Sequence, residues 1–166
     1  MVFLVDFIAR GLDQGLAVGA STWVVFGIGA MLGPVLFGHA ADRMGFRLAL
    51  RLAFVLQAAA VALPLVSTAT PAMLVSSLVI GAFVPGISSL ALGRMHELTA
   101  DDPRGRRSGW SIATVAFACG QAVAAYGFSY LYARTGGYGL LFALAAAAFL
   151  LALGLDLAAA LWRRKA

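Results

Sequence analysis

The longest stretches without a charged residue set the strongest limit on how this chain folds. Asp13 and Asp42 enclose 28 residues with no charge, counting His39 as neutral. A further 42 uncharged residues separate Arg51 from Arg94. A helix needs about 20 apolar residues to cross the hydrocarbon core of a membrane. The first stretch therefore predicts one membrane-spanning helix, and the second is long enough for two.

The overall composition points the same way. Hydrophobic residues make up 62% of the chain and charged residues 11%, with a mean hydropathy of +0.93. Soluble domains have roughly 45–50% apolar and 25% charged residues, so this composition indicates an integral membrane protein surrounded by a lipid bilayer. The net charge is +5, but the basic residues lie in short segments between apolar runs. They form no single basic face, which argues against a nucleic-acid partner.

The hydropathy pattern predicts an all-α fold, a polytopic transmembrane helix bundle of about five full spans preceded by a partial N-terminal helix. Residues 1–8 would rise only about 12 Å as a helix, against a hydrocarbon core of about 30 Å. They are interpreted as the end of a longer helix or as an interfacial segment. The chain, residues 1–166, is read as one transmembrane domain whose full spans cover about 16–39, 48–66, 71–93, 109–133 and 138–161.

Small residues in the first span predict close contact with another helix. Gly29 and Gly33 are four residues apart and lie on one helical face. In a membrane, glycines at this spacing let neighbouring backbones approach closely.

The positive charges predict the orientation of the bundle. Arg10 and Arg134 lie on one side of the membrane in this topology. The other side carries ten: Arg43, Arg47, Arg51, Arg94, Arg104, Arg106, Arg107, Arg163, Arg164 and Lys165. The positive-inside rule makes this richer side cytoplasmic, together with the C-terminus. Arginine outnumbers lysine eleven to one and asparagine is absent, which favours a GC-rich bacterial genome and hence the bacterial inner membrane.

The charged segment from Gly38 to Arg47 is predicted to turn the chain at the membrane surface. Gly38 would let two helix ends approach, Gly45 would adopt the positive φ of a tight reversal, and Asp42 would cap a helix N-terminus or meet a cation. Arg43 and Arg47 would hold the segment at the lipid headgroups. The same residues also suit a generic basic turn that only sets topology, and the segment alone leaves both interpretations open.

This segment resembles the signature loop of the major facilitator superfamily, which reads roughly Gly-x-Leu-Ala-Asp-Arg-x-Gly-Arg-Arg. Ala40 and Phe46 depart from that pattern. Six positions match it: Gly38, Ala41, Asp42, Arg43, Gly45 and Arg47. Residues 81–98 and the Gly120-Gln121 pair are similar to the YbfB/YjiJ-type branch of the superfamily. The resemblance implies that Asp42 belongs to a gating latch, which meets a neighbouring helix end or an arginine in one conformation and releases it in the other.

Taken over the whole chain, the resemblance implies the C-terminal half of such a transporter, from part of helix seven to helix twelve. The implied function is secondary active transport of a small solute by alternating access, without a cofactor. Alternating access needs two bundles that rock about a site. An N-terminal half or a second copy of the chain would therefore complete the transporter. The alternative is a non-transporting membrane protein, either truncated or docked as an accessory subunit on another membrane protein.

The resemblance implies that the first, third and fourth full spans line the substrate cavity. Thr114 and Gln121 are seven residues apart and share a helical face. Serine and threonine in membrane helices often only satisfy a backbone carbonyl, so a structural role stays open for each hydroxyl. The candidates for the substrate pathway are Gln121, Thr114, Tyr126, Tyr130, Ser88, Ser89 and Thr22, followed by Ser21, Ser76 and Ser77.

The other polar residues in the spans receive separate predictions. Asp6 is the candidate for proton coupling, with a plain surface position as the alternative, because ionisable residues within membranes are costly and usually functional. Asp156 is predicted to pair with Arg51. Gln57 is predicted to pack on a peripheral helix, and Cys119 to be a buried, inert thiol.

Enzyme chemistry and metal binding are disfavoured. His39 and the His96-Glu97 pair lie at the edges of loops, with no further ligand at metal-binding spacing. The chain has no set of nucleophile, base and orienting residue, and no phosphate-binding glycine loop of the P-loop type. The sequence therefore predicts neither a metal site nor a cofactor.

Overall fold

The computed structural model describes residues 1–100 and 102–162, except for the side chains of Pro103 and Arg106. The charges counted above at Arg106, Arg163, Arg164 and Lys165 lie outside the described side chains. All regular structure in the described part is helical: α1 (Val2–Asp6), a π-helical turn η1 (Phe7–Gly11), α2 (Gly15–Met44), α3 (Phe46–Val66), α4 (Thr70–Leu98), α5 (Pro103–Thr135) and α6 (Gly139–Trp162). From α2 onward, each of these five helices is long and apolar enough to cross a membrane. The predicted all-α bundle is confirmed.

The helices continue past the apolar runs, so the predicted loops are too long. The predicted turn from Gly38 to Arg47 is almost entirely helical, and Gly45 alone separates α2 from α3. The predicted loop 94–108 shrinks to residues 99–102, because α4 runs to Leu98 and α5 begins at Pro103. Hydropathy marks where the hydrocarbon ends, whereas backbone hydrogen bonding carries a helix on into the headgroup region. Asp102 supports the early start of α5, since its Oδ1 accepts a hydrogen bond from the Gly105 N–H at 2.9 Å.

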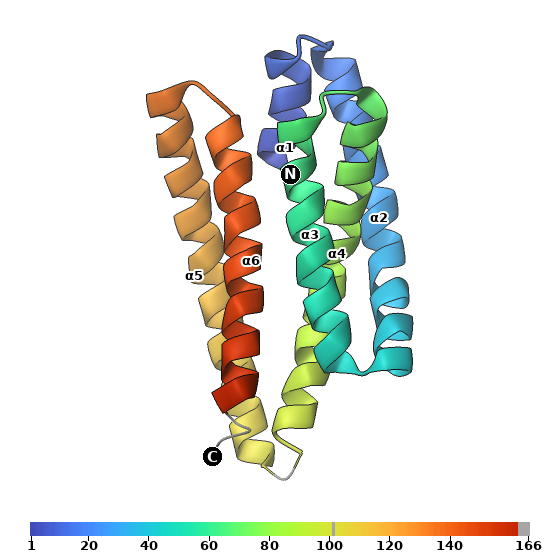
Figure 1. Ribbon diagram of the computed structural model, residues 1–166, viewed down its shortest axis with the longest axis vertical. Helices are drawn as coiled ribbons and strands as arrows, with labels where there is room; N and C mark the ends of the chain where they lie inside the picture. The colour runs from blue at the N-terminus through green and yellow to red at the C-terminus, as the bar shows by residue number, and fades with distance from the viewer. Residues whose placement is uncertain (101, 163–166) are drawn as a thin grey trace.

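The long helices run roughly side by side along the long axis of the molecule (Figure 1). The most extensive contact joins α2 and α4, and α3 packs on both α4 and α6. Short α1 and η1 pack on α2 at the upper end of the view. Helix α5 forms the outer edge of the bundle and touches α4 and α6 at few points. None of its described side chains is buried.

Glycines allow α2 and α4 to pack backbone against backbone. A Cβ placed on Gly29 or Gly33 would overlap the carbonyl oxygen of Leu78 or Ala82 on α4. From the other side, a Cβ on Gly81 would overlap the Phe26 carbonyl oxygen. The predicted helix contact through Gly29 and Gly33 is confirmed, and its partner is α4.

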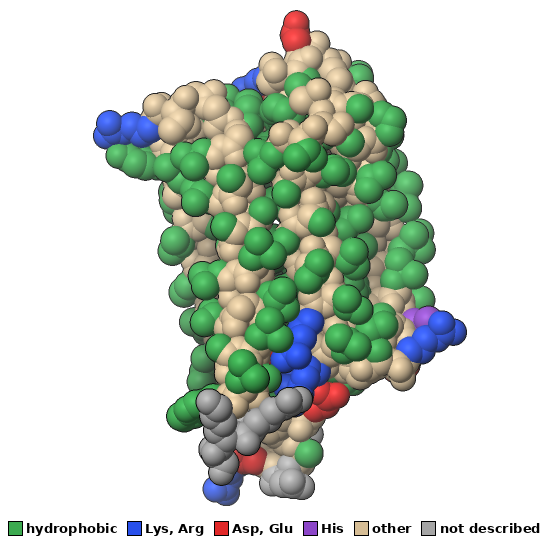
Figure 2. All heavy atoms as spheres, in the orientation of Figure 1, with side chains coloured by type: hydrophobic (Ala, Val, Ile, Leu, Met, Phe, Trp, Pro, Cys, Tyr) green, Lys and Arg blue, Asp and Glu red, His purple; other side chains and the backbone are tan. Residues whose placement is uncertain are grey.

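One end of the bundle carries most of the charge. The α2–α3 turn, the α4–α5 connection and the end of α6 all lie at the lower end of Figure 1. The same end shows most of the basic and acidic side chains in Figure 2, and a largely uncharged band covers the middle. Its described arginines are Arg43, Arg47, Arg51, Arg94, Arg104 and Arg107.

Candidate functional site

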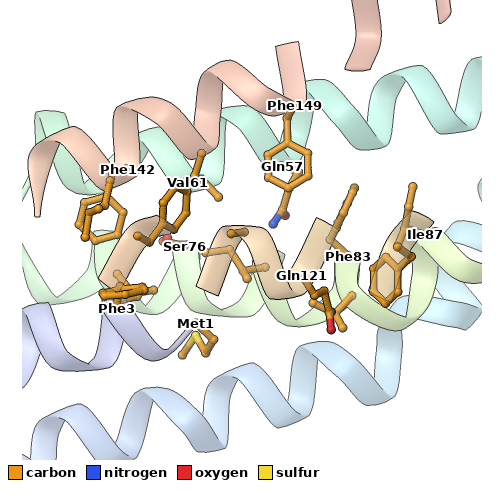
Figure 3. A pocket seen from close by; sticks show the side chains of 18 residues that line it. Met1, Phe3, Gln57, Val61, Ser76, Phe83, Ile87, Gln121, Phe142 and Phe149 are labelled. Carbon is orange, nitrogen blue, oxygen red and sulfur yellow. The ribbon is translucent and has the colours of Figure 1, made fainter. Parts of the chain in front are cut away.

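A half-open cavity of about 410 Å³ lies between the helices of the bundle (Figure 3). Side chains from α1, α3, α4, α5 and α6 line it, and most of them are aromatic or aliphatic. Its polar side chains among the described residues are Gln57, Ser76 and Gln121. Cavities of this size and mostly apolar character, with a few polar groups, are typical of small-molecule sites.

A second cavity, of about 270 Å³, lies between α4 and α5. Ile87 and Phe117 line both cavities, so the two adjoin along the α4–α5 contact. Ser88 and Thr114 line the second one. The Thr114 hydroxyl donates to the Trp110 carbonyl at 2.9 Å and keeps its oxygen lone pairs for another partner.

Four of the candidate substrate-pathway residues line these two cavities: Gln121 and Ser76 the first, and Thr114 and Ser88 the second. Gln121 and Thr114 share one face of α5, as the spacing predicted, and Ser88 faces that helix from α4. Tyr126 and Tyr130 lie away from both cavities and are 81% and 60% exposed. The Arg134 guanidinium lies 5.2 Å from the centre of the Tyr130 ring.

Two other candidates form hydrogen bonds within the helices that carry them. The Thr22 side chain is buried, and its hydroxyl donates to the Gly19 carbonyl at 2.6 Å. The Ser89 hydroxyl donates to the Gly86 carbonyl at 2.8 Å and lines neither cavity.

Gln57 is the cavity residue that sequence reasoning missed. It is 3% exposed, and no described residue donates a hydrogen bond to its Oε1. The sequence predicted a packing role because the family resemblance implied a peripheral position for this span. The structure instead directs the side chain into the central cavity (Figure 3). The available signal was an isolated amide in an otherwise apolar span, since intramembrane polar residues usually face the interior of a bundle.

Asp6 belongs to a short hydrogen-bonded network at the upper end of the bundle. The Tyr138 hydroxyl donates to Asp6 Oδ2 at 2.6 Å, and the Tyr132 hydroxyl donates to the Tyr138 oxygen at 3.0 Å. Arg10 Nε lies 3.3 Å from Asp6 Oδ1, and the Arg10 side chain is exposed. Burial, aided by the hydrogen bond to Asp6, raises the pKa of Tyr138, which directly precedes α6. Tyr138 therefore remains a proton donor to Asp6 across the physiological range.

The Asp42 segment has one residue with a special backbone conformation. Gly45 has φ 81° and ψ 152°, a combination open essentially to glycine alone, so the positive φ predicted there is confirmed. The prediction for Gly38 was wrong, because a Cβ on Gly38 would meet nothing within 4 Å. Asp42, Arg43 and Arg47 are exposed. Asp42 lies within α2 and caps no helix.

The structure also tests the predictions for Arg51, Asp156 and Cys119. Arg51 Nε donates to Asp156 Oδ2 at 2.6 Å, which confirms the predicted pair and joins α3 to α6. Cys119 is exposed on α5, so the prediction of a buried thiol was wrong. The apolar run around Cys119 indicated burial, but most of the surface of α5 has no neighbouring helix.

Metal ligands do not cluster in the part of the chain that the structure describes, since no three His, Cys, Asp or Glu side chains there come together. The geometry is that of a membrane bundle with polar groups in half-open cavities between its helices. The family model of the uncharacterised MFS-type transporter YbfB matches residues 1–157. The chain belongs to this family of major facilitator transporters. The comparisons with curated proteins and with solved structures found no match.

Membership of the YbfB-type family gives the bundle a general role. The family is one of transporters, and the five long apolar helices make the chain a multi-pass membrane protein. The two cavities and the exposed α5 are therefore the features to examine for a solute path.

Proposed function

We propose that the chain is the C-terminal half of a major facilitator transporter, which moves a small solute by alternating access. In this proposal α1 and η1 correspond to part of helix seven, and α2 to α6 correspond to helices eight to twelve. The family match supports the transporter class. The five long helices support the correspondence in number and order.

The observation that carries the proposal is the position of α5. This helix presents hydroxyl and amide groups toward α4 and tyrosines on another face, yet none of its described side chains is buried. A polar, unpacked membrane helix is costly when it faces lipid alone. A second bundle facing α5 would give these groups hydrogen-bond partners or enclose them in a water-filled pathway. An N-terminal half or a second copy of the chain would supply that bundle.

The proposed orientation puts the charged end in the cytoplasm of a bacterial cell. Arg43, Arg47, Arg94, Arg104 and Arg107 lie at the end that holds the α2–α3 turn. Under the positive-inside rule that end faces the cytoplasm of the inner membrane, together with the C-terminus.

Asp6 is the proposed proton-coupling residue. Its side chain is 29% exposed and accepts the Tyr138 hydroxyl, and Arg10 provides a nearby cation. A carboxylate that changes its partner between two conformations can bind and release a proton. The Tyr138 hydroxyl is the contact that would make or break in that exchange.

Asp42 is proposed to act in the gating latch together with Gly38, Arg43, Gly45 and Arg47. Gly45 holds a single-residue reversal, which places Asp42 one turn from the start of α3. In the assembled transporter, Asp42→Asn would lower solute uptake while membrane insertion stays the same. Unchanged uptake at equal expression would leave only the topological role.

The transport proposal is tested in proteoliposomes that contain a pH-sensitive dye. A panel of small solutes is added to the outside of vesicles, and internal pH and solute uptake are recorded. We expect at least one solute to move a proton with it. The Asp6→Asn variant is expected to abolish the proton signal while solute exchange continues. Gly27→Ala serves as the control, because a Cβ there meets nothing within 4 Å. If a two-bundle assembly moves no solute, the accessory-subunit interpretation takes its place.

A further inference from the structure

We propose that the central cavity is a binding site for a small uncharged molecule that combines an apolar body with one carboxamide or hydroxyl group. Helices α3 and α6 line the site together with α4 and α5, so the proposal rests on the proposed function in that the site adjoins its solute path. The test measures binding by the chain itself, so a failure to bind and a failure to transport are distinguishable.

The first observation is the unpartnered amide of Gln57. The residue is 3% exposed, and its Oε1 is buried without a hydrogen-bond donor among the described residues. A buried polar group left without a partner is costly, and native structures usually supply that partner. Figure 3 shows the amide end of Gln57 directed into the cavity. Rotation of the amide exchanges its oxygen and nitrogen, so Gln57 can present either an acceptor or a donor.

The second observation is the placement of another amide in the same cavity, where Gln121 reaches it from α5 (Figure 3). Ser76 of α4 is fully buried in the wall, where its hydroxyl donates to the Ala60 carbonyl at 2.7 Å, so the two amides are the groups open to a ligand. A carboxamide or hydroxyl both donates and accepts, and therefore matches this set of groups.

The other lining residues indicate that the body of the ligand is aromatic and uncharged. Phe83, Phe117, Phe142 and Phe149 supply aromatic surface around the polar groups. Within the described part of the chain, no charged side chain lines the cavity. An ion in such surroundings would lose its hydration with no side-chain counter-charge to replace it, so the lining side chains favour a neutral molecule. Aromatic rings pack well on other aromatic rings in offset or edge-on arrangements.

The volume suits a molecule of this kind. The cavity of about 410 Å³ lies within the range of roughly 300–1,000 Å³ found for ligand sites. Benzamide is a suitable probe because it joins one carboxamide to one aromatic ring. Toluene has a similar ring without hydrogen-bonding groups, and benzoate carries a charge.

The test measures binding of these three probes to the purified chain in nanodiscs by equilibrium dialysis, with empty nanodiscs correcting for partition into lipid. We expect benzamide to bind saturably. Toluene should bind with lower affinity than benzamide, and benzoate should show no saturable binding. In Gln57→Leu the dissociation constant for benzamide should rise about tenfold, because one hydrogen-bonded partner is lost. The affinity for toluene should not fall.

Two further variants keep the test decisive. Gln14→Leu makes the same change outside the cavity and should leave benzamide binding unchanged. Ala124→Phe fills the cavity from the loosely packed α5 and should abolish benzamide binding even if Gln57→Leu fails to fold. Benzamide and toluene binding with equal affinity would overturn the proposal, and so would saturable benzamide binding that survives Ala124→Phe. The first result would mean that the amides do not recognise the ligand, and the second that benzamide binds outside this cavity.

Discussion

The contact between α2 and α4 differs sharply from the surroundings of α5, although all three are long membrane-spanning helices that contain glycine and polar residues. Between α2 and α4 the glycines lie directly against the backbone of the opposite helix. On α5, a Cβ at Gly120 or Gly127 would meet nothing within 4 Å. Small residues therefore mark a contact only where a neighbour faces them.

The hydroxyl groups show the same contrast. Ser77 on α4 donates to the Thr22 carbonyl of α2 at 2.6 Å, so its hydrogen bond joins two helices. Thr114 and Thr135 on α5 donate to carbonyls of their own helix. The α2–α4 pair is therefore a fixed structural element, whereas α5 keeps its polar groups available for another molecule.

The largest effect is expected from a methyl group in the tight contact. Gly33→Ala would place a Cβ against the Ala82 carbonyl and force the two backbones apart. We expect a loss of at least about 2 kcal/mol in the free energy of unfolding. Gly120→Ala on α5 is the matched control and should be neutral or slightly stabilising, because alanine favours helix. Unfolding of both variants in mixed micelles measures the difference, and equal stabilities would contradict the contrast between the two regions.

The next effect concerns the ion pair that anchors α6 to α3. Arg51 and Asp156 are each 22% exposed, so water screens the pair only in part. Arg51→Gln would leave Asp156 without its cation and should cost about 1–2 kcal/mol, between the values for exposed and buried pairs. The double variant with Asp156→Asn should regain part of that loss. If the double variant loses the sum of the two single effects, the pair contributes no coupling.

A smaller effect is expected from the hydrogen bond between α2 and α4. Ser77→Ala removes the donor to the Thr22 carbonyl and should lower the free energy of unfolding by about 0.6–1.7 kcal/mol. Ser21→Ala is the control, because that exposed hydroxyl bonds to Val18 within α2. If both variants lose the same free energy of unfolding, the hydrogen bond between the helices contributes no more to stability than a bond within one helix.

The smallest effect on stability is expected at Cys119. Because the side chain is exposed on α5, Cys119→Ser should change the unfolding free energy by less than about 0.5 kcal/mol. The informative readout is reaction of the native thiol with a water-soluble maleimide in membranes. Labelling is expected if α5 lines a water-filled path, since a water-soluble reagent then reaches the exposed thiol. A lipid-facing control is Val55→Cys in the Cys119→Ser background, and labelling of Cys119 no faster than this control would place α5 against lipid.

The sequence was sufficient for the spans because hydropathy alone defines where a helix crosses the membrane. It also predicted the Gly29 and Gly33 face and the Arg51–Asp156 pair, since spacing and charge carry that information. It did not predict the helix ends at Met44 and Leu98, because hydrogen bonding continues beyond the hydrocarbon.

The candidate site was only partly predictable for a different reason. Thr114 and Gln121 share a face by simple periodicity, and the structure places that face along the two cavities. Gln57 and Cys119 were misjudged because burial depends on which helices are neighbours, and a one-dimensional pattern does not give neighbours. Both errors concern helices whose environment is set by packing between distant segments.

The central claim is that α5 faces a second bundle in a complete transporter. Its most direct test is the mass of the purified chain in detergent, by light scattering corrected for bound detergent, with and without co-expression of a protein that carries six further spans. The account predicts a stable assembly of two bundles: either a dimer of about 34 kDa, twice the 17.2 kDa chain, or a complex with the co-expressed protein. A monomer of 17.2 kDa under both conditions would contradict it.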